Sequence, residues 1–215
     1  MAAETTERGS DGQRRPRRRY HSPRRARQAA ETRTAILATA SQLFGERGWT
    51  RTTLAEIARN AQTAVETIYA GFGSKVGLLE AAIDVAVVGD EQAVPLARRP
   101  VYATLGTGTR AERIAAMAHV VTETHRAAPL MRALRQAATE EAQLAQRWST
   151  YESARRDEVA RALPLVVGKP VSEKLVDTIW TLISTEIYDK LTVERTWTKL
   201  RYRRWLTQTL ETLLP

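Results

Sequence analysis

Hydrophobic residues recur at intervals of three and four along most of the chain after residue 33, which is the spacing of amphipathic helices. The first such helix is expected near residues 33–47, and Gly48 follows at the position of a left-handed C-terminal cap. Its apolar face consists of Ile36, Leu37, Ala40, Leu43 and Phe44. Gly and Pro are sparse after residue 30 while Ala, Leu, Arg, Glu and Thr are common, so the pattern predicts an all-α protein.

Two short helices are expected directly after the first one. Thr53 and Glu56 have the spacing of a capping box and open a helix over residues 53–60. Thr63 and Glu66 repeat that spacing and predict a third helix after a turn of three or four residues. Two short helices joined by a tight turn and braced by a longer one are the layout of a helix-turn-helix. An ordinary three-helix core has the same spacing, so the pattern alone leaves both interpretations open.

Helical patterns continue through the second half of the chain. A fourth helix is expected to begin near Ser74, and the stretch from Gly89 to Gly108 is interpreted as a break. Further helices are expected near residues 109–126, 129–137, 140–163, 172–191 and 197–213. We therefore divide the chain into an arm over residues 1–30, a helix-turn-helix domain over 31–80 and a helical domain over 81–215.

The positive charge of the chain is concentrated at its N-terminus. Residues 1–27 contain nine arginines and three acidic residues, which accounts for six of the nine net positive charges. Almost nothing apolar accompanies them, so the arm is expected to be disordered on its own. A solubilising tail has this composition too, but arginines that neutralise phosphates release counterions, which favours a polyanion as the partner.

Several other classes of protein are disfavoured. The chain has no cysteine, which excludes disulfides and thiolate metal sites, and no apolar run reaches the length of a membrane span. No apolar segment follows the basic N-terminus as in a secretory signal, so a cytoplasmic protein without a membrane partner is expected. Nucleophile, phosphate-loop and metal-ligand motifs are missing, so we expect no enzyme, cofactor or metal.

The residues themselves decide between the two interpretations of the N-terminal helices. The pattern from Ile36 to Ala61, with Gly48-Trp49, Thr52-Thr53-Leu54 and Ile57-Ala58, resembles the first half of the TetR family signature. Thr67-Ile68-Tyr69, Phe72, Ser74-Lys75 and Leu78-Leu79 resemble the second half. The resemblance covers about fifty residues without a gap. The chain departs from it at Gln62, where the family usually has Gly, so the geometry of the turn is open.

The resemblance implies double-stranded DNA as the partner and gives roles to particular residues. Thr53, Tyr69 and Lys75 would contact phosphates, which set the register of binding. Base edges would face the turn and the start of the third helix, at Gln62, Thr63, Ala64, Val65, Glu66 and Thr67. This set has no Arg or Asn, the residues of strong bidentate contacts. We therefore interpret the Arg-rich arm as a second reader that enters the minor groove.

The C-terminal half, by a weaker resemblance, implies a ligand-binding and dimerisation domain. The last two long helices would pair across a two-fold axis into a homodimer that reads a pseudo-palindromic operator. The middle helices would enclose a small-molecule effector of unknown identity. Candidate lining residues are Tyr102, His119, His125, Trp148, Tyr151 and Trp180. His119 and His125 lie six residues apart and so do not share a helix face as metal ligands would.

The expected function is that of a ligand-responsive, sequence-specific transcriptional repressor released by its effector. The alternative is a non-specific nucleic-acid or nucleoid-binding protein, which the basic arm and the weak base-reading set favour. A monomer whose apolar stripes only fill its own core is the alternative to the dimer.

Overall fold

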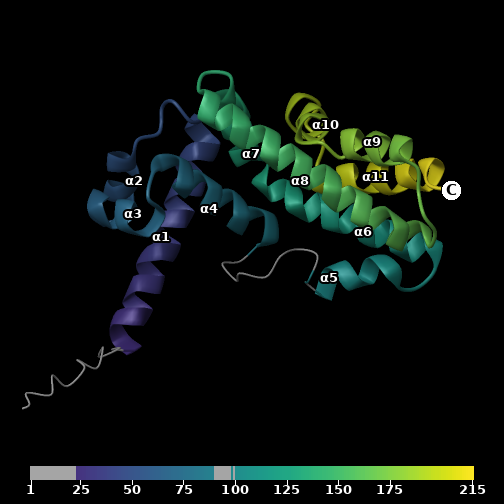
Figure 1. Cartoon of the computed structure of the whole chain (residues 1–215), viewed down its shortest axis with the longest axis horizontal. Helices are drawn as coiled ribbons and strands as arrows, with labels where there is room; N and C mark the ends of the chain where they lie inside the picture. Colours follow the sequence, from purple (N-terminus) through teal and green to yellow (C-terminus); the bar gives the residue numbers. More distant parts are fainter. Residues whose placement is uncertain (1–22, 90–97, 99) are drawn as a thin grey trace, which may run out of the picture.

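The computed structural model describes residues 23–89, 98 and 100–215, and within them every regular element is a helix (Figure 1). The N-terminal part comprises α1 (Pro23–Arg47), α2 (Leu54–Asn60), α3 (Val65–Phe72) and α4 (Lys75–Val88). The C-terminal part comprises α5 (Pro100–Ala103), α6 (Arg110–Thr124), α7 (Ala128–Ala138), α8 (Ala142–Val167), α9 (Glu173–Leu182), α10 (Thr185–Asp189) and α11 (Lys199–Leu213). The predicted all-α class is confirmed.

Helix α1 begins at Pro23, well before the start that the hydrophobic pattern predicts. Its buried residues are those of the predicted apolar face, but its first two turns are exposed and project from the body (Figure 1). Pro23 suits a first helical position, and Arg27 pairs with Glu31 one turn later. Residues 23–30 are therefore helical, contrary to the expected disorder of the arm, and residues 1–22 lie outside the described residues.

The turn between α2 and α3 has the geometry of a Schellman motif. The Thr63 N–H donates to the Ala58 carbonyl at 2.9 Å, and the Gln62 N–H donates to the Arg59 carbonyl at 3.3 Å. Gln62 takes the left-handed position with φ of 52°, a backbone conformation that glycine adopts at lower cost. The second predicted capping box is wrong: Thr63 belongs to this turn, and Ala64 is the N-cap of α3 without a side-chain bond.

Helices α3 and α4 approach each other closely where they join. Ser74 caps α4 by accepting a 3.0 Å hydrogen bond from the Gly77 N–H. A Cβ atom on Gly77 would lie 2.3 Å from the Phe72 carbonyl oxygen, which only a glycine avoids. The end of α3 is therefore held directly against the start of α4.

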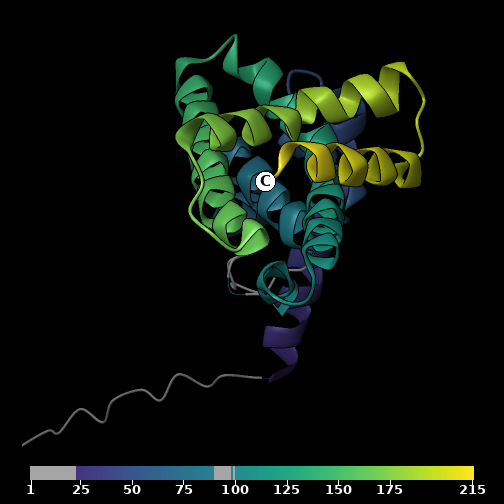
Figure 2. The ribbon, with the colours of Figure 1, turned by 90° about the vertical axis from the view of Figure 1, so that its right-hand side faces the viewer.

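The hydrophobic core of the N-terminal helices extends into the C-terminal half. Leu130, Met131 and Leu134 on α7 and Leu144 on α8 are buried in the same cluster as the inner faces of α1 and α4. A second cluster joins α6, α8, α9 and α11, around Tyr202, Leu206 and other residues. Figure 2 shows the ribbons of these helices from a second direction. The predicted domain boundary at residue 80 therefore does not separate two cores, because α7 packs against the helices on the other side of that boundary.

Two predicted helix boundaries in the C-terminal half differ in the structure. Helix α8 continues through Pro164 and ends at Val167, and its C-cap Gly168 has a φ of 80°. The single helix expected over residues 172–191 is broken, since α9 ends at Leu182 and Ser184 caps α10. Arg155 on α8 donates to the carbonyl oxygens of Trp180 and Ile183 at 3.1 and 3.5 Å, which satisfies acceptors that the break leaves free.

We expect Gln62→Gly to raise the free energy of unfolding by about 0.5–1 kcal/mol. Glycine removes the cost of the left-handed backbone, and its extra entropy in the unfolded chain offsets part of the gain. Chemical denaturation monitored by circular dichroism measures the change. Ala55→Gly, at an exposed position inside α2, is the control and should lower stability instead; a loss of stability in Gln62→Gly would contradict the argument.

Candidate DNA-binding surface and ligand cavity

The residues predicted to face DNA lie together on the turn and the outer side of α3. Gln62, Ala64, Glu66, Thr67 and Tyr69 are exposed, and Thr63 and Val65 are half-buried. Tyr69 is 54% exposed to solvent, which is high for a large aromatic residue. Ile68, on the opposite side of α3, is fully buried. The helix therefore presents one face outward while its other face is fixed.

Thr53, at the start of α2, caps the helix and can still donate a hydrogen bond to a phosphate. Its hydroxyl oxygen accepts the Glu56 N–H at 3.2 Å, which confirms the predicted N-cap. The hydroxyl hydrogen remains available as a donor, because a capping hydroxyl acts only as an acceptor. Glu56 in turn pairs with Arg47 at the end of α1. The cap is thus tied to the supporting helix while its side chain stays exposed.

Lys75 is placed differently from the free point charge that the resemblance implies. Its ammonium donates a 2.7 Å hydrogen bond to the Trp49 carbonyl oxygen and lies 4.0 Å from the centroid of the Trp49 ring. Burial lowers the pKa of Lys75, and the negative charge of Glu141 opposes this effect. The ammonium fastens the start of α4 to the loop after α1, so a phosphate contact would use its remaining N–H bonds.

Trp49 is a positioning residue that the sequence analysis left without a role. Its ring stacks on Phe44 with centroids 5.8 Å apart, and its indole N–H donates to the Glu141 carboxylate at 3.1 Å. Thr52, which is fully buried, places its hydroxyl 2.9 Å from the Gly48 carbonyl oxygen and fixes the same loop. The loop before α2 is thereby attached to the start of α8.

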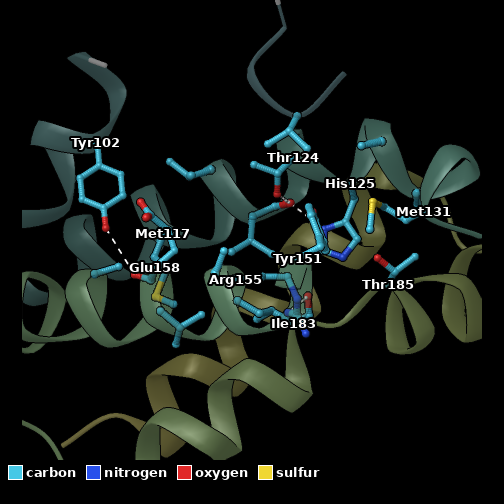
Figure 3. A pocket seen from close by; sticks show the side chains of 18 of the residues that line it. Tyr102, Met117, Thr124, His125, Met131, Tyr151, Arg155, Glu158, Ile183 and Thr185 are labelled. Atoms are coloured by element: carbon cyan, nitrogen blue, oxygen red, sulfur yellow. Dashed lines mark hydrogen bonds between the residues drawn. The ribbon is translucent and has the colours of Figure 1, made fainter. Parts of the chain in front are cut away.

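The C-terminal half contains a cavity of about 270 Å³ between α4, α6, α7, α8 and the break after α9 (Figure 3). Tyr102, His125 and Tyr151, which are among the residues expected at a ligand site, line this cavity. Most of the remaining lining is apolar and includes Val87 on α4. The cavity is therefore in direct contact with the last turn of the helix that follows α3.

Three predicted lining residues lie elsewhere. His119 is exposed, with Nδ1 3.4 Å from an Arg203 guanidinium nitrogen, because it occupies the outer side of α6. Trp148 packs against the N-terminal core, with its ring centroid 6.3 Å from that of Tyr151. Trp180 lies beneath the Arg155 guanidinium, 5.2 Å from the ring centroid. The prediction of these three as cavity residues is wrong for the described structure, since aromatic type alone does not specify which helix face looks inward.

Polar groups gather toward the two ends of the cavity (Figure 3). At one end the Tyr102 hydroxyl donates a long hydrogen bond of 3.4 Å to the Glu158 carbonyl oxygen. Burial, and then the charge of Glu158, raise the pKa of Tyr102. At the other end Arg155 forms a bidentate pair with Glu152 at 3.2 and 2.8 Å. The sequence analysis did not identify Glu158 and Arg155 as cavity residues, because charged residues on a long helix usually lie on its solvent-exposed face.

His125 is the buried titratable group of the cavity wall. Its Nδ1 lies 2.7 Å from the Val121 carbonyl oxygen, so the neutral ring carries its proton there and donates it. Burial lowers the pKa of His125 below its ordinary value, while hydrogen bonds to Val121 and Ser184 raise it less. The ring also packs on Tyr188 and Tyr202, with centroids 4.3 and 5.6 Å away.

Among the described residues, no group of three or more carboxylates and imidazoles is arranged to hold a metal ion. None of the described helices is long and apolar enough to cross a membrane.

We expect the protein to lose stability as the pH falls from 7 to 5, partly through His125. The unfolded ring takes up a proton near its ordinary pKa of 6.5 while the buried ring resists it, so the unfolded state binds more protons. The contribution reaches up to about 1.4 kcal/mol per pH unit. Urea denaturation at several pH values should show a shallower dependence in His125→Gln. The exposed His119→Gln is the control, and an unchanged pH profile in His125→Gln would rule the assignment out.

Comparison with known proteins finds similarity to one family in the N-terminal helices and to solved structures along most of the chain. Residues 36–82 match the family of bacterial regulatory proteins described as the tetR family. No curated protein matches the sequence. A putative TetR-family transcriptional regulator from Rhodococcus sp. has a similar structure, with a TM-score of 0.66 and 19% identity over 86% of this chain and 100% of that one.

A second solved structure of similar fold is NalD from Pseudomonas aeruginosa, the secondary repressor of the MexAB-OprM multidrug efflux pump. Its TM-score is 0.61, with 18% identity over 87% of this chain and 95% of that one. The likeness to both structures extends beyond α4 and shows that the helical C-terminal half shares their fold. The N-terminal helices, over residues 36–82, thus match the tetR family of bacterial regulatory proteins, and the chain as a whole shares the fold of these two solved structures.

Proposed function

We propose that this regulator is a repressor that binds a pseudo-palindromic operator as a homodimer and is released by a small-molecule effector. The observation that carries the proposal is the position of α4. Val87 in its last turn lines the cavity, while its first turn is locked to α3 and to Trp49. An occupant that displaces the last turn therefore moves a rigid helix whose other end supports α3.

The DNA contacts follow from the exposed side of the helix-turn-helix. Thr53 and Tyr69 offer hydroxyl donors to phosphates, and Lys75 offers its remaining N–H bonds. The base-facing set is Gln62, Thr63, Ala64, Val65, Glu66 and Thr67, in which Val65 and the Thr67 methyl group suit thymine methyl groups. Arg24, Arg25 and Arg27 on the exposed start of α1 add sequence-independent attraction to the phosphates. A regulator with this function has to reach the chromosome, so we expect it in the cytoplasm.

A homodimer is supported by apolar side chains near the start of α11. Leu200 is 46% exposed and Val193, in the π-helical turn before α11, is 59% exposed. Trp197 and Trp205 are half-buried beside them, with ring centroids 6.1 Å apart. Exposed apolar groups of this kind mark interaction sites, and a two-fold pair delivers two copies of α3 to one operator.

Selection of duplexes from a random DNA pool tests the function as a whole. A sequence-specific regulator should enrich an inverted repeat and prefer it over competitor DNA by roughly 10³-fold or more. A non-specific nucleic-acid binder is the second candidate, since the base-facing set lacks Arg and Asn while the start of α1 is basic. A pool that gains no sequence preference would establish that candidate and contradict the proposed one.

Tyr69→Phe should weaken binding to the selected duplex and to competitor DNA by a similar factor, close to tenfold. The lost hydroxyl removes one phosphate hydrogen bond, worth about 1–1.5 kcal/mol, and carries no sequence information. Fluorescence anisotropy at fixed salt gives both affinities. Tyr102→Phe removes the same group inside the cavity and should leave DNA binding without effector unchanged. Unaltered affinity in Tyr69→Phe would show that its hydroxyl makes no such contact.

Leu200→Asp should shift the protein from dimer to monomer at micromolar concentration. A carboxylate buried in an apolar interface loses hydration without gaining a partner. Sedimentation equilibrium measures the change, and Gln208→Asp, an exposed position on the same helix, serves as the control. Sedimentation of the unaltered protein as a monomer would contradict the homodimer.

A further inference from the structure

The cavity contains a carboxylate oxygen that has no partner. Glu158 lines the cavity, and among the described residues no donor bonds its Oε1, although that atom is buried. Its other oxygen, Oε2, accepts from the Arg161 guanidinium at 2.6 Å toward the surface. Buried acceptors without a donor are rare in folded proteins, and each calls for an explanation. A bound donor would supply one.

We propose that the effector is an amphipathic amine whose ammonium group binds Glu158 and whose apolar body fills the rest of the cavity. The inference rests on the proposed function and adds the chemical class of the effector. An ammonium group has three N–H donors and a positive charge, which matches a carboxylate better than a neutral donor does. The terminal torsion of a glutamate is broad, so the carboxylate can turn toward the ligand at little cost.

The surroundings of Glu158 favour the same ligand group. The Tyr102 hydroxyl is held by a hydrogen bond of 3.4 Å, which is long for this type of bond, and its oxygen can accept a second N–H. Tyr102 and Met117 line the same cavity as Glu158 and are drawn with it in Figure 3. An aromatic face and a polarisable sulfur are both favourable neighbours for an organic cation.

The positive charge in the cavity wall is not available to an anionic ligand. Arg155 uses its guanidinium N–H groups on the Glu152 carboxylate and on the carbonyl oxygens of Trp180 and Ile183. A carboxylate ligand would therefore have to break this set, and it would meet the charge of Glu158. The wall thus selects against anions through both groups.

The apolar part of the cavity determines where the body of the ligand extends. Its described lining includes Met117, Val120, Val121 and Val159, and it continues to Met131 and Val87. A ligand held at Glu158 therefore reaches α4 with its apolar end. Binding of the amine and displacement of α4 are thus effects of one molecule.

Four octyl compounds that differ only in the head group test the proposal: octylamine, octyltrimethylammonium, octanol and octanoate. Binding is measured by tryptophan fluorescence with the full chain, after its DNA binding has been established. We expect octylamine to bind at least tenfold more tightly than octanol or octanoate, and octyltrimethylammonium, which lacks N–H donors, to fall between them. Octylamine should also release the selected duplex.

Glu158→Gln should weaken octylamine binding at least tenfold and leave octanol binding within a factor of two. Asp157→Asn removes the same charge from the neighbouring, exposed position on α8 and should change neither. Preference for octanoate or octanol, equal loss in both variants, or no binding of any compound would overturn the amine proposal. DNA binding that persists in those cases leaves the regulator itself intact, whereas failure to bind DNA would refute the proposed function separately.

Discussion

The hydrophobic core that α7 shares with α1 and α4 is the constraint on which the rest of the molecule depends. Leu130, Met131 and Leu134 are buried against the N-terminal helices, so the helix-turn-helix does not have a core of its own that could move freely. Close-packed interiors shift between discrete arrangements more readily than they deform. Under the proposed function, a change at the cavity wall would consequently displace α4 and α7 as whole helices.

A smaller cluster around Trp49 fixes the orientation of the DNA-facing surface. The indole ring, the Lys75 ammonium and the Glu141 carboxylate connect the loop before α2, the start of α4 and the start of α8. Each of these groups is polar and partly screened from water, so each bond is stronger than it would be on an open surface. The same residues that support α2 are therefore also bonded to the start of α8, so a movement of α8 would affect them.

Local signals in the sequence were sufficient to locate the cap of α2 and the buried face of α1. Thr53 caps α2 as its spacing with Glu56 predicts, because a capping bond joins residues only three positions apart. The early start of α1 was not predicted, because residues 23–30 have no apolar face and so show no helical periodicity of hydrophobic residues. The break after Leu182 depends on Arg155 from a different helix, and the unpartnered oxygen of Glu158 depends on the shape of the cavity. Neither feature has a signal in the sequence near it.

The ring of His125 lies between the cavity and the C-terminal helix. It lines the cavity and also packs on Tyr202 of α11, the helix to which we assign the contact with a second subunit. In the proposed repressor, one occupant would therefore contact both α4, which supports α3, and His125, which packs on α11. Thermodynamic linkage then requires that filling one subunit alters the affinity of the other whenever α11 shifts. Such a dimer would respond to its effector over a concentration range different from that of two independent sites, and the contact between His125 and Tyr202 would set how steep that response is.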